Sequence, residues 1–485
     1  MTQNVNTRTL SVVALLAILT AGVPAIAGDE YAFVLTTDYY TAAYYSTIEA
    51  EPPYTADVSI SSVNADAVAY YDEGEDMVFV VNRFLADNIQ IVDPGSGFAT
   101  TGQYSVGNGS NPHDIRLAGP DKAYVSRFEW NTLFICDPYT GDSLGAIDLS
   151  EFADTDGIPE MDRMAIVGDR LFVTLNMIDH TTWLPTGPGK IAVIDVAADT
   201  LVDADPIAPG VQPIVLSLAN PYTELRHDPC RGELTIGCLG GWGVMDGGVE
   251  LIDPFTLESK GVIATEFQLG GDVSDVLLSP GARGYAVVMD STPWPDNFAR
   301  LVSFGRATGE VLDTLYVQST GGGATLAGIE MSRQGEVYLC DRDVTRPRVR
   351  IYDFPVDTLI TTVDVGVPPY DIVLVQQAHA GVPGQPSGPP DPNPSALLVC
   401  PNPARLEAAI RFELPGEAPA APLEISVHDV MGRLVRSLEA GICGAGPHEI
   451  VWDGTDDRGR SVAGGIYYCR LAGGREGCAR VVLLR

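Results

Sequence analysis

The phrase Leu251-Ile252-Asp253-Pro254 decides the fold, because short apolar runs that end in Asp and often continue with Pro recur along the chain. The other copies are Ile91-Val92-Asp93-Pro94, Phe134-Ile135-Cys136-Asp137-Pro138, Val193-Ile194-Asp195, Val302-Ser303-Phe304-Gly305 and Ile351-Tyr352-Asp353. Their anchor positions, 93, 137, 195, 253, 305 and 353, are separated by 44, 58, 58, 52 and 48 residues. Repeats of this period are typical of radial or solenoid arrays.

Each anchor phrase lies third in a group of four short β-rich stretches. In one group His113 to Leu117 is followed by Lys122 to Ser126, Thr132 to Cys136 and Ser143 to Leu149, with turn residues between them. This succession predicts a four-stranded antiparallel meander, which is the blade of a β-propeller.

Seven stretches along the chain have the character of a second strand. They are residues 32–35, 77–81, 123–126, 171–175, 234–237, 285–289 and 337–340. The chain begins on a second strand, whereas Tyr370 to Val375 is a first strand with nothing after it. A seven-bladed ring, closed by this last strand pairing with three N-terminal strands, accounts for both ends. The alternative is an open stack, which leaves both ends unpaired and needs capping units.

The N-terminal residues 1–27 have the order of a secretory signal peptide. Arg8 precedes an apolar run from Leu10 to Ala21, and Ala25-Ile26-Ala27 supplies a small-residue cleavage site. The run is too short to span a membrane, and no other stretch reaches spanning length. We expect an exported protein without a membrane-spanning segment, at the cell surface or outside the cell, with the periplasm as an alternative.

The charge balance limits the partners. The formal net charge is −35, from 64 acidic and 29 basic side chains. This balance disfavours nucleic acid and anionic lipid surfaces as partners, because binding them needs clustered Lys and Arg. Cations and basic partners remain open, as does the alternative that acidity only keeps the protein soluble.

The composition divides the chain into an all-β head and tail. We place the propeller at residues 28–378 and a stiff Pro/Gly-rich linker at 379–395. The strand pattern resumes on a different period over residues 396–485, a length close to that of a small immunoglobulin-like β-sandwich.

A series of short motifs runs through this last segment. They are Pro401-Asn402-Pro403, Ile410-Arg411-Phe412-Glu413-Leu414-Pro415, Val427-His428-Asp429-Val430-Met431-Gly432-Arg433, Trp452-Asp453-Gly454-Thr455-Asp456-Asp457-Arg458-Gly459 and Gly464-Gly465-Ile466-Tyr467. The series resembles the immunoglobulin-like domain of flagellar hook-capping proteins and the C-terminal sorting domains of type IX secretion cargo. The resemblance implies export to, or assembly at, the cell surface, with an outer-membrane secretion machinery as a partner. His428 departs from it, since the family usually has Tyr there.

The repeats of the head resemble bacterial propellers with YVTN-type repeats and the wider lactonase-like or quinoprotein-like group. The resemblance covers about Glu30 to Gln377 and lies in the repeat phrase. Propellers of this type include binding proteins, lactonases and dehydrogenases, so the resemblance leaves the function open.

The first strands provide one candidate site. Asp66, Asp114, Asp162, Asp275 and Asp371 occupy the same apparent register in five blades, with Thr223 and Gly328 in the other two. First strands line the channel of a propeller, so we expect an acidic ring at one mouth, flanked by His113 and Tyr370. Crowded carboxylates can recruit a hard cation such as Ca²⁺. Alternatively, each Asp caps the loop that enters its strand.

A second acidic cluster, Asp154-Thr155-Asp156-Gly157 with Glu160, resembles the start of a calcium loop. It does not complete the twelve-residue pattern of such loops. We name these residues as candidate metal ligands, with a solvated acidic loop as the alternative.

Aromatic residues in predicted loops and at strand ends provide another route to a ligand. They are Tyr39, Tyr40, Phe128, Trp130, Trp183, Trp242 and Trp294. Such rings stack against sugars or peptides, or else pack between blades.

The sequence offers no catalytic constellation. The phrase Gly141-Asp142-Ser143-Leu144-Gly145 resembles a nucleophile motif, but it lies in a predicted hairpin, whereas a nucleophile elbow joins a strand to a helix. The six histidines show no metal-ligand spacing. We therefore name no catalytic residues.

Export permits disulfide bonds between the eight cysteines. Cys469 and Cys478 flank Gly473-Gly474 symmetrically, so a tight hairpin would place them opposite each other on adjacent strands. We predict that this pair forms a disulfide.

Three functions remain after the sequence is read. The first is an exported, non-catalytic binding or scaffold protein with a protein or glycan ligand at the cell surface. The second is a lactonase-like hydrolase with a cation at the channel, and the third is a quinoprotein-type dehydrogenase.

Overall fold

The computed structural model describes residues 30–229, 231–279, 282–290, 298–318, 326–343, 345–354, 356–376, 397–400, 404, 408–414, 422–429, 433–442, 446–472 and 478–483. Almost all regular secondary structure among these residues is β-strand, which confirms the predicted all-β class. The predicted signal peptide 1–27 and linker 379–395 lie outside the described residues, as does Trp294.

Seven antiparallel sheets follow one another through the described part of residues 30–376. The first sheet contains β29 (Pro369–Gln376), β1 (Glu30–Thr37), β2 (Ala43–Glu49) and β3 (Ala56–Ser62) in that spatial order. The second contains β4 (Ala67–Asp72), β5 (Met77–Asn82), β6 (Asn88–Asp93) and β7 (Ala99–Ser105). The third contains β8 (Pro112–Gly119), β9 (Lys122–Arg127), β10 (Thr132–Cys136) and β11 (Ser143–Asp148).

The remaining four sheets repeat this meander. The fourth contains β12 (Met161–Val167), β13 (Arg170–Leu175), β14 (Lys190–Asp195) and β15 (Thr200–Leu201), with β16 (Ile214–Val215) also paired to β14. The fifth contains β17 (Arg226–Asp228), β18 (Glu233–Cys238), β19 (Gly248–Asp253) and β20 (Glu258–Thr265). The sixth contains β21 (Asp272–Leu278), β22 (Arg283–Met289), β23 (Ala299–Gly305) and β24 (Val311–Val317). The seventh contains β25 (Leu326–Met331), β26 (Glu336–Asp341), β27 (Arg348–Asp353) and β28 (Thr358–Asp364).

Three short helical turns lie between strands. They are η1 (Pro94–Ser96), η2 (Ser150–Phe152) and α1 (Glu266–Leu269). Thr265 caps α1 in a reciprocal capping box with Gln268.

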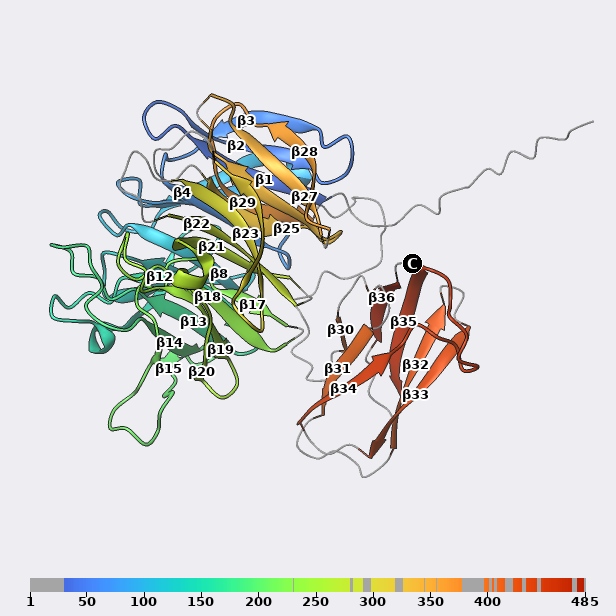
Figure 1. Ribbon diagram of the computed structural model, residues 1–485. Helices are drawn as coiled ribbons and strands as arrows, with labels where there is room; N and C mark the ends of the chain where they lie inside the picture. The colour runs from blue at the N-terminus through green and yellow to red at the C-terminus, as the bar shows by residue number, and fades with distance from the viewer. Residues whose placement is uncertain are drawn as a thin grey trace, which may run out of the picture.

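The ring of sheets is closed by the two ends of the head. β29 pairs antiparallel with β1 from Glu30↔Gln376 to Thr36↔Pro369, as the sequence predicted, and Figure 1 shows them side by side. The inner strand of each sheet contacts the inner strand of the next, except between the fifth and sixth sheets, where β18 contacts β21. The inner strand of the seventh sheet, β25, contacts β29 of the first. The sheets therefore form a β-propeller around a central channel.

The recurring anchor phrase builds the third strand and the turn after it, as predicted. Its copies end β6, β10, β14, β19, β23 and β27. Asp137 accepts hydrogen bonds from the N–H groups of Tyr139 and Thr140, and Asp253 does the same for Phe255 and Thr256. The repeated Asp is therefore a turn residue that fixes the connection to the fourth strand.

The core of the propeller lies between neighbouring sheets. Six second strands carry an aromatic ring that is fully buried, namely Phe33, Phe79, Tyr124, Phe172, Tyr285 and Tyr338. The third-strand residues opposite four of them are Ile or Val, which pack closely in a pleated sheet.

The C-terminal segment forms two sheets of its own. One contains β30 (Leu398–Cys400), β31 (Ala408–Leu414) and β34 (Gly446–Trp452). The other contains β33 (Leu434–Ile442), β32 (Pro422–Asp429), β35 (Gly465–Ala472) and β36 (Cys478–Leu483). Trp452 is fully buried, its ring meets Tyr467 edge to face, and its indole N–H donates to the Thr455 carbonyl at 2.9 Å. Trp452 is therefore a core anchor of this segment.

Among the described residues, no helix has the length and apolar character that a membrane span requires.

Candidate functional site: the channel and the face around it

One position on each inner strand faces the channel. In six sheets, one inner-strand residue pairs with the buried aromatic residue of the second strand, and in the fifth sheet it pairs with Thr235. The residue that faces the channel lies two positions before this paired residue. In chain order these residues are Val68, Asp114, Arg163, Glu224, Asp275, Gly328 and Asp371, and all of them line the channel cavity. We call them the channel ring.

Three of the predicted acidic residues, Asp114, Asp275 and Asp371, belong to this ring, but Asp66 and Asp162 do not. Asp66 precedes β4 and forms an ion pair with Arg83. In β12 the ring position belongs to Arg163, and Asp162 lies one residue before it. β12 has an irregular register between Met161 and Met164, and such a shift turns the next side chain to the other face of a strand. The irregular register of β12 therefore moves Asp162 off the channel face, whereas Asp66 lies two residues before the ring position Val68 and outside β4.

The three ring aspartates make the same contact. Asp114 accepts a hydrogen bond from Met164 N at 2.8 Å, Asp275 from Ile329 N at 2.9 Å and Asp371 from Ala69 N at 2.8 Å. Each donor belongs to the inner strand of the next sheet. The carboxylates therefore join adjacent sheets, rather than capping the loop that enters their own strand.

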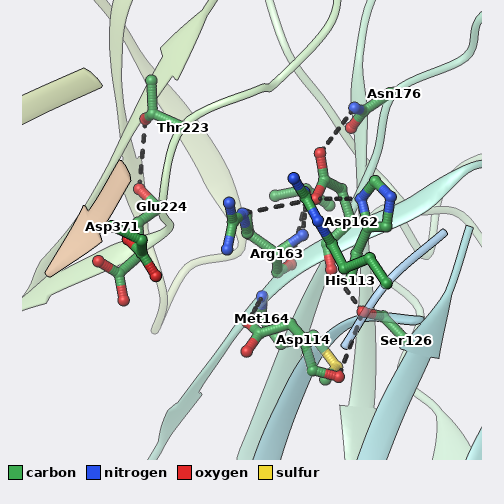
Figure 2. A network of polar contacts seen from close by, with 12 residues as sticks. His113, Asp114, Ser126, Asp162, Arg163, Met164, Asn176, Thr223, Glu224 and Asp371 are labelled. Atoms are coloured by element: carbon green, nitrogen blue, oxygen red, sulfur yellow. Dashed lines mark hydrogen bonds and ion pairs between the residues drawn. The ribbon is translucent and has the colours of Figure 1, made fainter. Parts of the chain in front are cut away.

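The channel ring is not purely acidic, which corrects the prediction. Arg116 contacts Asp114 at 2.8 Å and Glu224 at 3.4 Å, and Arg226 contacts Glu224 at 3.1 Å and Glu330 at 2.6 Å. Arg163 extends between Asp162 on one side and Glu224 and Asp371 on the other (Figure 2). The prediction rested on the repeated Asp alone and did not include the arginines at and beyond the ring position.

Burial governs ionisation in the channel. It raises the pKa of Asp114 to about 6 and that of Asp275 to about 7, although Arg116 and Arg226 act in the opposite direction. Burial also raises the pKa of Asp371. For Glu224 burial alone would have the same effect, but Arg226 and Arg116 outweigh it and hold its pKa below the usual range. The ring thus contains two kinds of group: carboxylates with raised pKa values, which ionise with difficulty, and guanidinium groups, which are permanently charged.

His113 lies at the start of β8, at the end of the strand that the sequence assigned to the channel mouth. Its Nδ1 is 2.9 Å from Asp162 Oδ1, and the other oxygen of Asp162 accepts from Asn176 at 2.9 Å (Figure 2). The His113 ring stacks on Phe128, with centroids 4.5 Å apart. Tyr370 lies at the same mouth and accepts a hydrogen bond from Arg83 at 2.9 Å.

Exposed apolar side chains gather on one face of the propeller. In an antiparallel meander, the connection between the second and third strands lies at the end where the first strand begins. Six of these connections carry exposed apolar groups, namely Tyr39, Tyr40, Phe84, Leu85, Trp130, Trp183, Leu184, Trp242, Val244 and Phe298. We call this surface the aromatic face. It surrounds the mouth that His113 and Tyr370 occupy.

The predicted loop aromatics divide between this face and the core. Tyr39, Tyr40, Trp130, Trp183 and Trp242 are exposed to different degrees, and Tyr40 is 91 % exposed. Phe128 is buried, because its ring lies between those of His113 and His180. Phe84 is a member that the sequence analysis missed, although it follows a predicted second strand.

The second acidic cluster gains a histidine in the folded protein. Ligand atoms of Asp156, Glu160 and His180 lie within 4.8 Å of one another. Asp154 instead accepts a hydrogen bond from Asp156 N at 3.1 Å. Burial, followed by the charges of Asp156 and Asp154, raises the pKa of Glu160 to about 8. His180 could not be found from spacing, because it enters from a separate connection.

The cysteine pair differs from its predicted geometry. In the hairpin of β35 and β36, Cys469 lies opposite Ala479 and Cys478 lies opposite Arg470. The two cysteines are thus offset by one residue and are not directly opposite. The side chain of Cys478 lies outside the described residues, so the disulfide remains a prediction.

Comparisons with known proteins agree with the two-part architecture. Residues 404–477 match the family model of the FlgD Ig-like domain. No curated protein matches the chain.

Several solved structures are similar to this chain at low sequence identity, and the first named below has a TM-score above 0.5. A putative 6-phosphogluconolactonase from Bacteroides fragilis is 14% identical, with 72% of this chain and 98% of that chain covered and a TM-score of 0.52. PorZ, a surface component of the type IX secretion system of Porphyromonas gingivalis, is 13% identical. The match covers 91% of this chain and 63% of that chain, with a TM-score of 0.44. Hydrazine synthase from Kuenenia stuttgartiensis is 15% identical. The match covers 66% of this chain and 99% of that chain, with a TM-score of 0.47. Our chain is therefore similar to the lactonase-like propellers in fold, and its last segment is similar to the FlgD Ig-like domain.

Proposed function

We propose that this protein is an exported binding protein whose seven-bladed propeller recognises a ligand through the aromatic face and whose Ig-like tail serves in sorting or surface assembly. The aromatic face carries this proposal. Exposed rings from separate sheets surround one channel mouth, and rings of this kind dominate the energy of recognition surfaces. The signal-peptide pattern and the FlgD Ig-like match support the exported location.

The channel ring favours binding over the lactonase-like alternative. A metal-dependent hydrolase needs carboxylate oxygens that are free to bind the ion. Asp114, Asp275 and Asp371 instead each hold a backbone N–H group of the next sheet. Withdrawing them would leave these buried donors without partners.

The test compares two variants of the mature chain for binding to the surface of the producing cells. The first replaces Tyr40, Phe84 and Trp242 of the aromatic face with Ala. The second replaces Phe255, which is 65 % exposed in the β19 to β20 connection on the opposite face. Loss of an aromatic anchor worth about 2 kcal/mol weakens binding about 30-fold, so the triple variant should lose detectable binding while Phe255→Ala keeps it.

Treatment of the cells before binding identifies the ligand class. Protease removes protein receptors, whereas periodate oxidises the vicinal diols of glycans. Equal binding by the triple variant and the wild type would overturn the role of the aromatic face. Confinement of the intact protein to the periplasm, shown by surface labelling, would overturn the surface location.

A further inference from the structure

A buried carboxylate oxygen and an imidazole nitrogen face each other at the edge of the aromatic face. Glu160 precedes β12, and its side chain is completely buried. One of its oxygens accepts from Ile178 N at 2.9 Å, but Oε1 has no hydrogen-bond partner among the described residues. His180 Nε2 lies 3.4 Å from that oxygen and also lacks a hydrogen-bond partner there. An unpaired polar atom in such a place is costly unless another group bonds to both atoms.

The imidazole of His180 is held in one orientation. Its ring stacks on those of Phe128 and Trp183. The ring centroids are 6.1 Å apart for Phe128 and 5.6 Å apart for Trp183, with interplanar angles of 2° and 9°. Its other nitrogen, Nδ1, faces Glu129 Oε2 at 3.6 Å. A carboxylate near Nδ1 favours the tautomer that leaves Nε2 as an acceptor, and metal-binding histidines commonly have such a partner.

Asp156 completes a three-ligand set on the solvent side. One of its oxygens accepts from Ile158 N at 2.8 Å, and the residue is exposed, so its carboxylate can adjust to an ion. The 3.4 Å between His180 Nε2 and Glu160 Oε1 equals the separation of two ligand atoms about 2.1 Å from one tetrahedral ion. Asp154 and Glu129 add negative charge nearby.

We propose that Asp156, Glu160 and His180 bind a divalent transition-metal ion such as Zn²⁺, with Glu129 as a positioning residue behind His180. One nitrogen and two carboxylate oxygens suit Zn²⁺, whereas Ca²⁺ takes six to eight oxygen ligands. The fourth position faces solvent, on the surface that we assign to recognition. The calcium-loop hypothesis from the sequence is thus replaced by a site that needs His180.

The experiment measures Zn²⁺ binding by the mature full-length chain without an affinity tag, after dialysis against a chelator. Titration calorimetry and metal analysis should give one Zn²⁺ per chain for the wild type. Glu160→Gln and His180→Gln should each weaken binding at least about 100-fold, and Glu129→Gln about tenfold or more. His227→Gln, a histidine in the fifth sheet, is the matched control and should bind as the wild type does.

Thermal unfolding separates loss of the site from loss of the fold. Glu160→Gln has the shape of the neutral carboxylic acid, so in EDTA it should unfold at or above the wild-type temperature. Added Zn²⁺ should raise the unfolding temperature of the wild type and leave that of Glu160→Gln unchanged. His180→Gln, on a partly exposed connection, provides the same comparison if the buried substitution affects folding.

Three results would overturn the proposal. They are equal Zn²⁺ affinity in the wild type, Glu160→Gln and His180→Gln; no Zn²⁺ binding by the folded wild type; and a preference for Ca²⁺ over Zn²⁺ at this site. None of them bears on cell binding through Tyr40, Phe84 and Trp242, which lie on other sheets.

Discussion

Single carboxylates in this protein have roles that their sequence neighbours do not reveal. Asp253 stabilises a turn between two strands, whereas Asp275 lines the channel and joins two sheets. Glu160 is buried too, but one of its oxygens points at a histidine instead of a backbone donor. Whether an acidic residue is structural or functional here depends on what donates to its oxygens.

The raised pKa of Asp275 makes stability depend on pH. Its native pKa is about 7, mainly because of burial, and the unfolded value is about 3.9. Between these values the native state binds more protons than the unfolded state, so this group's contribution to stability falls as pH rises from about 4 to about 7. The fall is at most about 4 kcal/mol, at about 1.4 kcal/mol per pKa unit. Asp275→Asn removes this dependence, so the stability of the variant relative to the wild type should rise between pH 4 and pH 8.

Urea unfolding at pH 4, 6 and 8 measures this difference. Asp142→Asn, in an exposed turn, provides the control. A difference between Asp275→Asn and the wild type that stays constant over the range would show that Asp275 is ionised throughout.

At the scale of strands, small residues decide where large ones fit. Gly284 on β22 lies opposite Phe304 on β23 and Leu278 on β21. A Cβ atom on Gly284 would lie 2.3 Å from Phe304 Cζ and 2.8 Å from Leu278 Cδ2. The fully buried ring of Phe304 therefore occupies the space above the glycine.

Gly284→Ala should destabilise the propeller by about 1–3 kcal/mol, because the buried ring has to move. Urea unfolding of the purified variant measures the loss. Gly187→Ala is the matched control, since a Cβ there meets nothing within 4 Å. If both substitutions had the same effect, the loss would come from the backbone and not from the contact with Phe304.

At the scale of the whole molecule, stability depends on the pairing of strands from opposite ends of the head. β29 is the inner strand of the first sheet and contacts both β4 and β25. Its Ile372 and Val375 are buried, and its Asp371 holds Ala69 N of the second sheet. The ring thus closes through contacts between residues more than 300 positions apart in the chain.

A chain that ends at Val367 lacks β29 and should not unfold cooperatively, because β1 becomes an unpaired edge and two sheet junctions lose their inner strand. A chain that ends at Gln376 keeps the closure and should unfold in one transition. Size-exclusion chromatography and urea unfolding of the two chains test this. Equal unfolding midpoints would show that the closure is dispensable.

The sequence by itself determined the all-β class, the four-strand repeat and the pairing of the C-terminal strand of the head with the first strands. These features depend on local hydrophobic alternation and turn residues, which act over a few positions and remain visible in one sequence. The motifs of the last segment likewise sufficed to relate it to the FlgD Ig-like domain, and the match over residues 404–477 agrees.

Only the tertiary structure decided which side chains meet. The irregular register of β12 placed Arg163 in the channel ring and removed Asp162 from it. Glu224 belongs to the ring as well, whereas Asp66 lies before β4 and pairs with Arg83. His180 reaches Glu160 because two connections of the fourth sheet lie at the same end, a contact that sequence spacing does not encode. A shift of one residue turns a strand side chain to the opposite face, so composition and repeat fixed the architecture, whereas packing decided the chemistry of the channel and of its rim.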